Sequence, residues 1–324
     1  MGKIALFGPS GAAGDSIAAA LRQQGRPYRV VGRSASSLQA HFGADPLAEI
    51  IGWSPDDPES VRAAATGIDT IVYLVGVPYH QFELHPKLMR ATLDGAIVAG
   101  VQRIVLIGTV YPYGRARSES ISEDHPLEPH TFKGRMRKEQ EDMLFEAQAA
   151  GKIQATVLRL PDFYGPNVDR SFVHGAFQAA LAAKRALLIG PVDRPHQYVF
   201  TPDVGPVVTA LADEPRAYAQ SWHFGGSGAI TQREFVRRIY AAAGTPLRTF
   251  VVNETMLRVI GLFDKTMNAL VEMQYLQTEP VIMDDAALRQ LLPGLRATPY
   301  DDAIGLTLAA MRQSKGFGLG SLTT

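Results

Sequence analysis

The chain has 324 residues, of which 46% are apolar and 20% charged, with 32 basic and 32 acidic side chains and no cysteine. These values are typical of a folded globular protein and exclude disordered, fibrous and disulfide-stapled classes. The balanced charge offers no basic surface for nucleic acid or an anionic membrane, so we expect a small-molecule partner. The absence of cysteine excludes thiolate nucleophiles and Cys-ligated metals and agrees with a cytoplasmic location.

Neither a targeting segment nor a membrane span is expected. The first residues, "MGKIALFGPSG", form too short an apolar run for a signal peptide and read as a strand that enters a turn. The most apolar later segment, 256–273, is interrupted by charged residues and falls short of the roughly 20 apolar residues that a membrane span needs.

Short β-branched runs alternate with amphipathic stretches in the first half of the chain. The expected strands are 3–7, 28–31, 49–51, 70–75, 103–107 and 155–160. This alternation predicts an α/β fold, with a Rossmann-type doubly wound parallel sheet. Beyond residue 160, prolines and glycines break the pattern, and helical patterns at 231–243 and 255–273 predict a smaller, irregular C-terminal substrate lobe.

A dinucleotide-binding turn follows the first predicted strand. The segment "LFGPSGAAGDSIAAAL" places Gly8, Gly11 and Gly14 between a strand and a helix. In that context the glycines allow a tight turn, close approach of the backbone to pyrophosphate and close packing of helix on sheet. The residues expected to contact the cofactor here are Gly8, Ser10, Gly11, Ala12, Ala13 and Gly14.

These patterns predict the domain organisation. Residues 1–160 form an NAD(P)-binding domain, whose sheet is completed by segments near 195–225. Residues 161–313 form mainly the substrate lobe, and 314–324 a flexible tail.

The end of the second predicted strand, "VVGRSASS", indicates which dinucleotide is bound. It carries Arg33 and Ser34, and no acidic residue occurs before Asp45. An acidic residue would bind the 2′-hydroxyl of NAD, whereas an arginine pairs with the 2′-phosphate of NADP. We therefore favour NADP(H) over NAD(H), with Arg33 as a solvated loop residue as the alternative.

Further segments resemble the short-chain dehydrogenase/reductase superfamily, in the extended or atypical branch labelled NAD-dependent epimerase/dehydratase. They are "GIDTIVYLVG", "GVQRIVLIGTVYPYG", "SEDHPLEP", "LRLPDFYGP" and the C-terminal "YLQTEPVIMDDAALRQLLPGLRATPYDDAI". The resemblance covers nearly the whole chain. It implies further cofactor contacts at Val75, Gly76, Lys133 and Leu160, and it leaves the oligomeric state open, with a homodimer as the common arrangement.

The sequence departs from this superfamily at the catalytic residues. Thr109 matches the catalytic Ser/Thr, but the Tyr and Lys of the Tyr-x-x-x-Lys motif are replaced by Lys133 and Arg137. Proton donation by a lysine is chemically feasible because the reference pKa values of Lys and Tyr are similar, and an arginine can still hold the cofactor ribose. The segment is also similar to the K-x-x-x-R-[RK]-x-x-E pattern of isoflavone and phenylpropanoid reductases. The alternative is a solvated basic helix face.

Other side chains are expected near the substrate because of where they follow strands. The candidates are His80, Tyr111, Asp162, Tyr164 and Arg194. Tyr111 is also a candidate for a displaced proton donor. No spacing of His, Asp or Glu supports a metal site.

Three functions remain open. The leading hypothesis is NADPH-dependent reduction of a small-molecule carbonyl or activated double bond, with Thr109, Lys133 and Arg137 as catalytic residues. The second is an NAD-dependent sugar-nucleotide epimerase or dehydratase, which the resemblance suggests. The third is a non-catalytic NAD(P)-binding redox sensor, which the loss of the family Tyr and Lys suggests.

Overall fold

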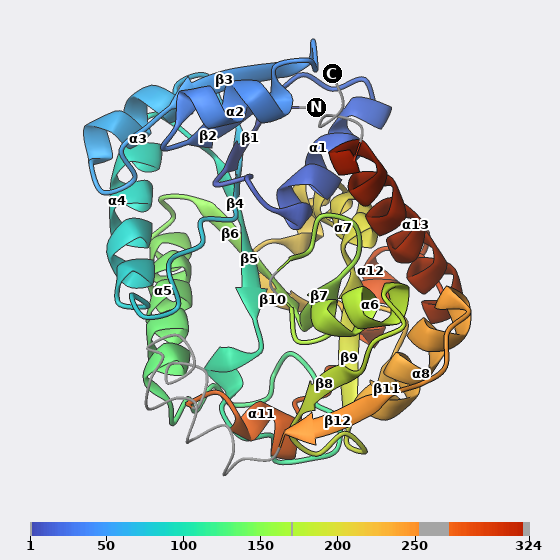
Figure 1. The fold of residues 1–324 in the computed structure, drawn as a ribbon. Helices are drawn as coiled ribbons and strands as arrows, with labels where there is room; N and C mark the ends of the chain where they lie inside the picture. Colours follow the sequence, from blue (N-terminus) through green and yellow to red (C-terminus); the bar gives the residue numbers. More distant parts are fainter. Residues whose placement is uncertain (1, 170, 253–271, 320–324) are drawn as a thin grey trace.

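The centre of the protein is a parallel sheet of seven strands in the order β10-β6-β5-β4-β1-β2-β3 (Figure 1). The computed structural model describes residues 2–169, 171–252 and 272–319. The strands are β1 (Ile4–Phe7), β2 (Tyr28–Gly32), β3 (Ala48–Gly52), β4 (Thr70–Tyr73), β5 (Arg103–Thr109), β6 (Gln154–Leu160) and β10 (Gln220–His223). The strand order reverses between β1 and β4, the point at which doubly wound sheets bind ligands. The predicted fold class is confirmed.

Strand β1 shows how the sequence buries both faces of this sheet. All four of its residues are apolar and fully buried. Ile4 and Leu6 belong to one hydrophobic core, and Ala5 and Phe7 to the other, because successive side chains of a strand point to opposite faces. Continuous apolar strands of this kind are what a parallel sheet covered on both sides requires.

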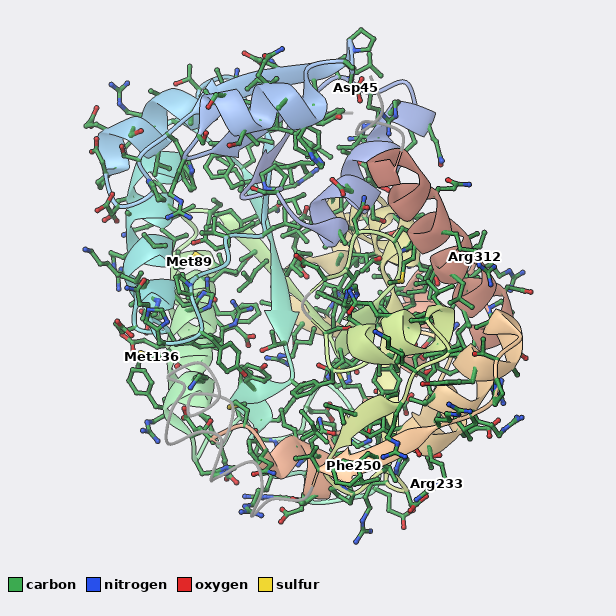
Figure 2. All side chains as sticks on the ribbon, viewed as in Figure 1. Asp45, Met89, Met136, Arg233, Phe250 and Arg312 are labelled. Atoms are coloured by element: carbon green, nitrogen blue, oxygen red, sulfur yellow. The ribbon has the colours of Figure 1, made fainter. Side chains whose placement is uncertain are left out.

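Helices cover both faces of the sheet. Helices α1, α2 and α7 contribute to the first core, and α3, α4 and α5 to the second. Their bounds are α1 (Ala12–Gln23), α2 (Ala35–Phe42), α3 (Pro58–Ala65), α4 (Leu84–Val98), α5 (Phe132–Ala149) and α7 (Thr201–Asp213). Met89 of α4, which is labelled in Figure 2, is fully buried in the second core.

A smaller lobe follows β6 and contains two small sheets, β11-β9-β7 and β12-β8. Its elements are β7 (Asp162–Tyr164), α6 (His174–Leu181), β8 (Ala186–Ile189), β9 (Pro195–Phe200), β11 (Ala229–Thr231), α8 (Gln232–Ala243), β12 (Thr249–Val252), α11 (Tyr275–Thr278) and α13 (Tyr300–Leu319). Three short helices belong to the larger domain instead: η1 (Tyr111–Tyr113) between β5 and α5, η2 (Pro215–Ala217) between α7 and β10, and α12 (Ala286–Leu291), whose Leu288 is buried in the first core. Aromatic side chains dominate its core: Tyr164 packs against Phe177, Phe200 and Phe235.

Two sequence expectations concern segments at the edge of the described structure. The helix expected over 255–273 lies outside the described residues except for its last two positions. The expected tail, 314–324, begins inside α13, which extends to Leu319, and 320–324 are not described. The domain boundary predicted at residue 160 stays a prediction.

Within the described ranges, none of the helices has the length and hydropathy that crossing a bilayer would take.

A buried ion pair fixes α5 against the sheet. The Arg159 guanidinium of β6 lies 2.6 Å from the Glu141 carboxylate of α5, and both side chains are almost fully buried. Arg159 also donates to the Tyr113 hydroxyl at 2.6 Å, and that hydroxyl lies 2.5 Å from the His223 ring on β10. The network joins α5, η1, β6 and β10 at the carboxyl end of the sheet.

We expect Arg159→Leu to destabilise the fold by about 3–5 kcal/mol, because it leaves the Glu141 carboxylate buried without a partner. The matched control is Lys138→Ala, which removes an i,i+4 ion pair with Asp142 on the outer face of the same helix and should cost about 0.3–0.5 kcal/mol. The free energy of unfolding in urea measures both. Equal costs for the two variants would contradict the structural role of Arg159.

Candidate functional site

The glycines after β1 form a turn that leaves room for a ligand at one position only. Gly8 has φ +80°, and a Cβ on Gly14 would lie 2.0 Å from the Pro9 carbonyl oxygen. A Cβ on Gly11, by contrast, would meet no atom within 4 Å. Gly11 is also the N-cap of α1 and provides no side-chain cap for that helix. The arrangement fits a pyrophosphate above the helix N-terminus.

The other residues predicted to contact the cofactor lie near this turn or beneath it. Ser10, Ala12 and Ala13 belong to the turn and the start of α1. The loop after β4 passes beside the turn, since the Cα of Val75 would be 2.8 Å from a Cβ on Gly8, and Gly76 faces open space. Leu160 is buried in the first core, paired in register with Thr109. These cofactor contacts stay predictions.

The adenosine end of the predicted site lies where β2 ends. Arg33 follows Gly32 directly, is exposed, and forms no hydrogen bond or ion pair within the described part of the chain. Its guanidinium therefore remains available to a phosphate. Ser34 is the N-cap of α2, and its hydroxyl accepts a hydrogen bond from the Ser37 amide at 3.1 Å. Ser34 thus already has a structural task.

The catalytic end of the site is built by β5 and α5. Thr109 is the last residue of β5, and its hydroxyl oxygen accepts a hydrogen bond from the Tyr111 amide at 3.3 Å. Lys133 and Arg137 lie one turn apart on the inner face of α5, with exposed fractions of only 4% and 5%. The alternative of a solvated basic face therefore does not describe these two residues. Lys138 does match it, because its ammonium pairs with Asp142 on the outer side.

Lys133 is enclosed by one carboxylate and two aromatic rings. Its ammonium donates to Glu272 Oε2 at 2.6 Å, and its backbone amide donates to Glu272 Oε1 at 3.0 Å. The ammonium also lies 5.0 Å from the ring centre of Tyr79 and 5.7 Å from that of Phe82. Ring faces attract a cation, so these contacts stabilise a buried positive charge.

Arg137 is held by a carbonyl and an uncharged histidine. It donates to the Ile107 carbonyl at 2.9 Å, and its Nη1 lies 3.3 Å from His85 Nδ1. Burial, together with the Arg137 charge, lowers the pKa of His85 to about 2. His85 is therefore neutral at physiological pH and can accept the hydrogen bond. Burial also lowers the pKa of Arg137, which remains a cation because arginine starts so high.

Two tyrosines and a carboxylate complete this end of the site. The hydroxyls of Tyr111 and Tyr79 are 3.1 Å apart and share a hydrogen bond. Burial raises the pKa of Tyr111 to about 12. Burial raises the pKa of Asp162, the first residue of β7, to about 6. Its carboxylate forms no hydrogen bond or ion pair in the described ranges, so it is available to a substrate.

Several predicted substrate contacts lie elsewhere. Tyr164 is 1% exposed inside the aromatic core of the lobe, where it packs rather than lines a pocket. Arg194 is exposed in the turn between β8 and β9, and none of its described contacts reaches the residues around Lys133. His80 is exposed in the loop after β4. The same loop supplies Tyr79 and Phe82, which sequence reasoning missed although the segment "VPYHQFELHP" is rich in aromatic residues.

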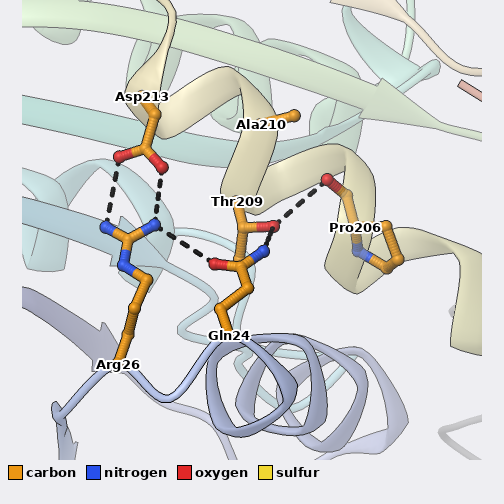
Figure 3. A pocket seen from close by; sticks show the side chains of 6 residues that line it. All are labelled: Gln24, Arg26, Pro206, Thr209, Ala210 and Asp213. Atoms are coloured by element: carbon orange, nitrogen blue, oxygen red, sulfur yellow. Dashed lines mark hydrogen bonds and ion pairs between the residues drawn. The ribbon is translucent and has the colours of Figure 1, made fainter. Parts of the chain in front are cut away.

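A surface pocket lies between α1 and α7 and is unrelated to this site (Figure 3). Arg26 donates to both carboxylate oxygens of Asp213, at 2.5 and 3.1 Å, and Gln24 donates to Thr209 at 3.1 Å. Gln24 is the C-cap of α1, at the opposite end of the helix from Gly11. The pocket therefore marks a polar contact between two helices.

Comparison with known proteins supports the predicted resemblance. The sequence model of the "NAD dependent epimerase/dehydratase family" matches residues 4–224. A dTDP-6-deoxy-L-talose 4-dehydrogenase (NAD(P)(+)) of Kitasatospora kifunensis is 27% identical over 262 residues, which are 75% of this chain and 80% of that protein.

Solved structures share the fold. The DesIV dTDP-glucose 4,6-dehydratase of Streptomyces venezuelae, with NAD and TYD bound, superposes with a TM-score of 0.78 at 18% identity over 97% of this chain and 98% of that one. A short-chain dehydrogenase/reductase superfamily protein of Agrobacterium tumefaciens, with NAD bound, gives 0.75 at 19% identity over 98% and 99%.

The geometry of the glycine turn predicts different effects for alanine at Gly11 and at Gly14. Gly11→Ala should cost about 1 kcal/mol of stability or less, because glycine is a better N-cap than alanine, but weaken NADPH binding about tenfold or more, because its methyl group projects into the space for pyrophosphate. Gly14→Ala should destabilise the fold by about 1–3 kcal/mol, because its methyl group meets the Pro9 carbonyl. Calorimetric titration and thermal unfolding separate the two effects. Unchanged NADPH affinity in Gly11→Ala would contradict the placement of the cofactor.

Proposed function

Because the chain belongs to the NAD-dependent epimerase/dehydratase family, we propose that it is an oxidoreductase that uses NADPH to reduce the carbonyl group of a small molecule. The observation that carries the proposal is the burial of Lys133 and Arg137 one turn apart on α5, where Arg137 donates to the Ile107 carbonyl of β5, the strand that ends at Thr109. Burying two cations at the carboxyl end of a Rossmann sheet costs free energy of folding. Their burial therefore supports a catalytic site in which Lys133 and Arg137 take the roles of the motif residues, and it counts against a site that has lost its activity.

A bound nicotinamide would provide the hydride chemistry, and the chain's residues would bind and protonate the substrate oxygen. The Thr109 hydroxyl donates a hydrogen bond to that oxygen. Lys133 supplies the proton, since an ammonium carries three N–H donors. Arg137, held by Ile107 and His85, keeps its charge and binds the cofactor ribose.

The choice of NADP(H) rests on Arg33. Its exposed guanidinium at the end of β2, without a described partner, supports pairing with a 2′-phosphate. The carbonyl is favoured over an activated double bond because the dehydrogenase from Kitasatospora kifunensis is named as a 4-dehydrogenase with NAD(P)(+). A cytoplasmic location and a homodimer remain part of the proposal.

A sugar-nucleotide epimerase or dehydratase is the second candidate. Its support is that the DesIV structure, which is similar in fold, is a dTDP-glucose 4,6-dehydratase with NAD bound. The absence of the motif tyrosine at position 133 counts against it. NAD that remains bound through purification would favour this candidate, whereas exchangeable NADPH would favour the reductase. The third hypothesis, a non-catalytic NAD(P)-binding redox sensor, is disfavoured because the family that the chain belongs to is named for enzymes.

We predict that Arg33→Ala weakens NADPH binding by about 1.5–3 kcal/mol, the contribution of charged hydrogen bonds, and leaves NADH binding unchanged. Calorimetric titration of the apo-protein with both cofactors measures the difference. The control is Arg312→Ala, an exposed arginine of α13 that is labelled in Figure 2 and is not among the residues predicted to contact the cofactor. A wild type that prefers NADH would contradict the choice of cofactor.

Lys133→Ala should lower kcat about 10²–10⁴-fold, the usual contribution of a proton-transfer group, with cofactor affinity changed much less. The assay follows nicotinamide absorbance with NADP⁺ and dTDP-6-deoxy-L-talose, the compound in the relative's name. Lys138→Ala, five residues along the same helix, is the matched control. Full turnover in Lys133→Ala with cofactor bound would sink the assignment.

A further inference from the structure

The contact between Lys133 and Glu272 has the geometry of a bound anion. Two donors of one residue, the backbone amide at 3.0 Å and the ammonium at 2.6 Å, each hold one oxygen of the same carboxylate. Lys133 lies in the first turn of the 18-residue helix α5, whose N-cap is Thr131. The helix dipole and the charged hydrogen bond both favour an anion at this point.

Only one partner of this ion pair can leave the site. The Lys133 side chain is 5% exposed and is enclosed by Tyr79 and Phe82, whereas the Glu272 side chain is 27% exposed. If Glu272 turned outward, Lys133 would be a buried cation without a partner, which is strongly unfavourable. The site therefore needs an anion at all times, but that anion need not be Glu272.

The charges around the site favour an incoming anion. Arg137 lies one turn further along α5, and its described contacts are a carbonyl and the neutral His85. Burial opposes ionisation of Glu272, yet the hydrogen bonds from Lys133 outweigh it and lower the pKa of the carboxyl. Glu272 is thus ionised and is the one carboxylate bound directly to Lys133 within the described residues, while Glu141, which is paired with Arg159, and Asp162 lie farther from its ammonium.

We infer that the backbone amide and ammonium of Lys133 form a binding site for a carboxylate or phosphate group of the substrate, and that Glu272 occupies this site when no substrate is bound. The substrate class is then an anionic carbonyl compound, either an oxo acid or a phosphorylated carbonyl compound. One N–H of the ammonium contacts the anion while another faces the carbonyl oxygen. Only the assignment of the anion to the substrate rests on the proposed function.

The test replaces Glu272 by a small anion from solution. Thermal unfolding of Glu272→Ala is followed with sodium acetate, sodium phosphate and sodium chloride at matched ionic strength and pH, without cofactor. The wild type, the double variant Lys133→Met/Glu272→Ala and Glu279→Ala are compared. Glu279 lies a few residues beyond Glu272 and pairs with the exposed Arg115. The Glu279→Ala variant therefore reports on the loss of a surface ion pair. Glu272→Gln replaces Glu272→Ala if the latter does not fold.

We expect the unfolding midpoint of Glu272→Ala to rise by about 2 °C or more, and to saturate, with acetate or phosphate but not with chloride. The wild type, the double variant and Glu279→Ala should respond to all three salts alike. The more effective anion identifies the substrate group as carboxylate or phosphate. The same response in the double variant, or no specific response in Glu272→Ala, overturns the inference.

This outcome is separable from that of the proposed function. If acetate and phosphate have no specific effect while the wild type still reduces a carbonyl with NADPH, the anion site alone is wrong. If an anion stabilises Glu272→Ala but the wild type binds neither NADPH nor NADH, the anion site stands as a property of Lys133. The reductase proposal, and with it the assignment of the anion to the substrate, then falls.

Discussion

The buried ion pair between Arg159 and Glu141 is the interaction on which the site depends. It ties α5 to β6 through a 2.6 Å contact between two almost fully buried side chains. Glu141 lies one helical turn beyond Arg137, which lies one turn beyond Lys133, and all three occupy the inner face of α5. A helix fixed at Glu141 therefore presents both cations to the end of β5. The pair acts together with the hydrogen bond from Arg137 to the Ile107 carbonyl and the packing of Leu144 to set the positions of Lys133 and Arg137 relative to β5.

The chemistry of the site follows from how each buried charge is balanced. Lys133 has Glu272 and two ring faces, whereas Arg137 has a carbonyl and a neutral histidine. Ring faces and carbonyls stabilise cations without neutralising them. Lys133 and Arg137 consequently keep their charges, which supports the proposed stabilisation of negative charge on a substrate oxygen. The positive charge of Lys133 also explains why the Glu272 carboxylate binds to it.

Much of the dinucleotide half was predictable because its signals are local. The alternation of apolar residues gave β1 to β6, and the strand, glycine turn and helix are contiguous at the N-terminus. The substrate half was less predictable. Tyr164 follows β6 just as Asp162 does, yet the Tyr164 ring fills the aromatic core of the lobe, whereas the Asp162 carboxylate lies near the Tyr79 and Tyr111 hydroxyls. The two residues are two positions apart in β7 and share one face of the strand, so their different surroundings depend on which elements pack there, and a single sequence does not say which.

The sequence by itself determined the fold class, the glycine turn between β1 and α1 and the arginine after β2, and it predicted that Lys133 and Arg137 replace the motif tyrosine and lysine. Periodicity and turn chemistry are properties of neighbouring residues, so they can be read along the chain. Only the tertiary structure decided that both cations are buried, that Tyr79, Phe82 and His85 surround them, and that Glu272 lies on Lys133. The last of these contacts joins residues 139 positions apart, and such a pairing depends on how the lobe packs against the sheet, which no local pattern encodes.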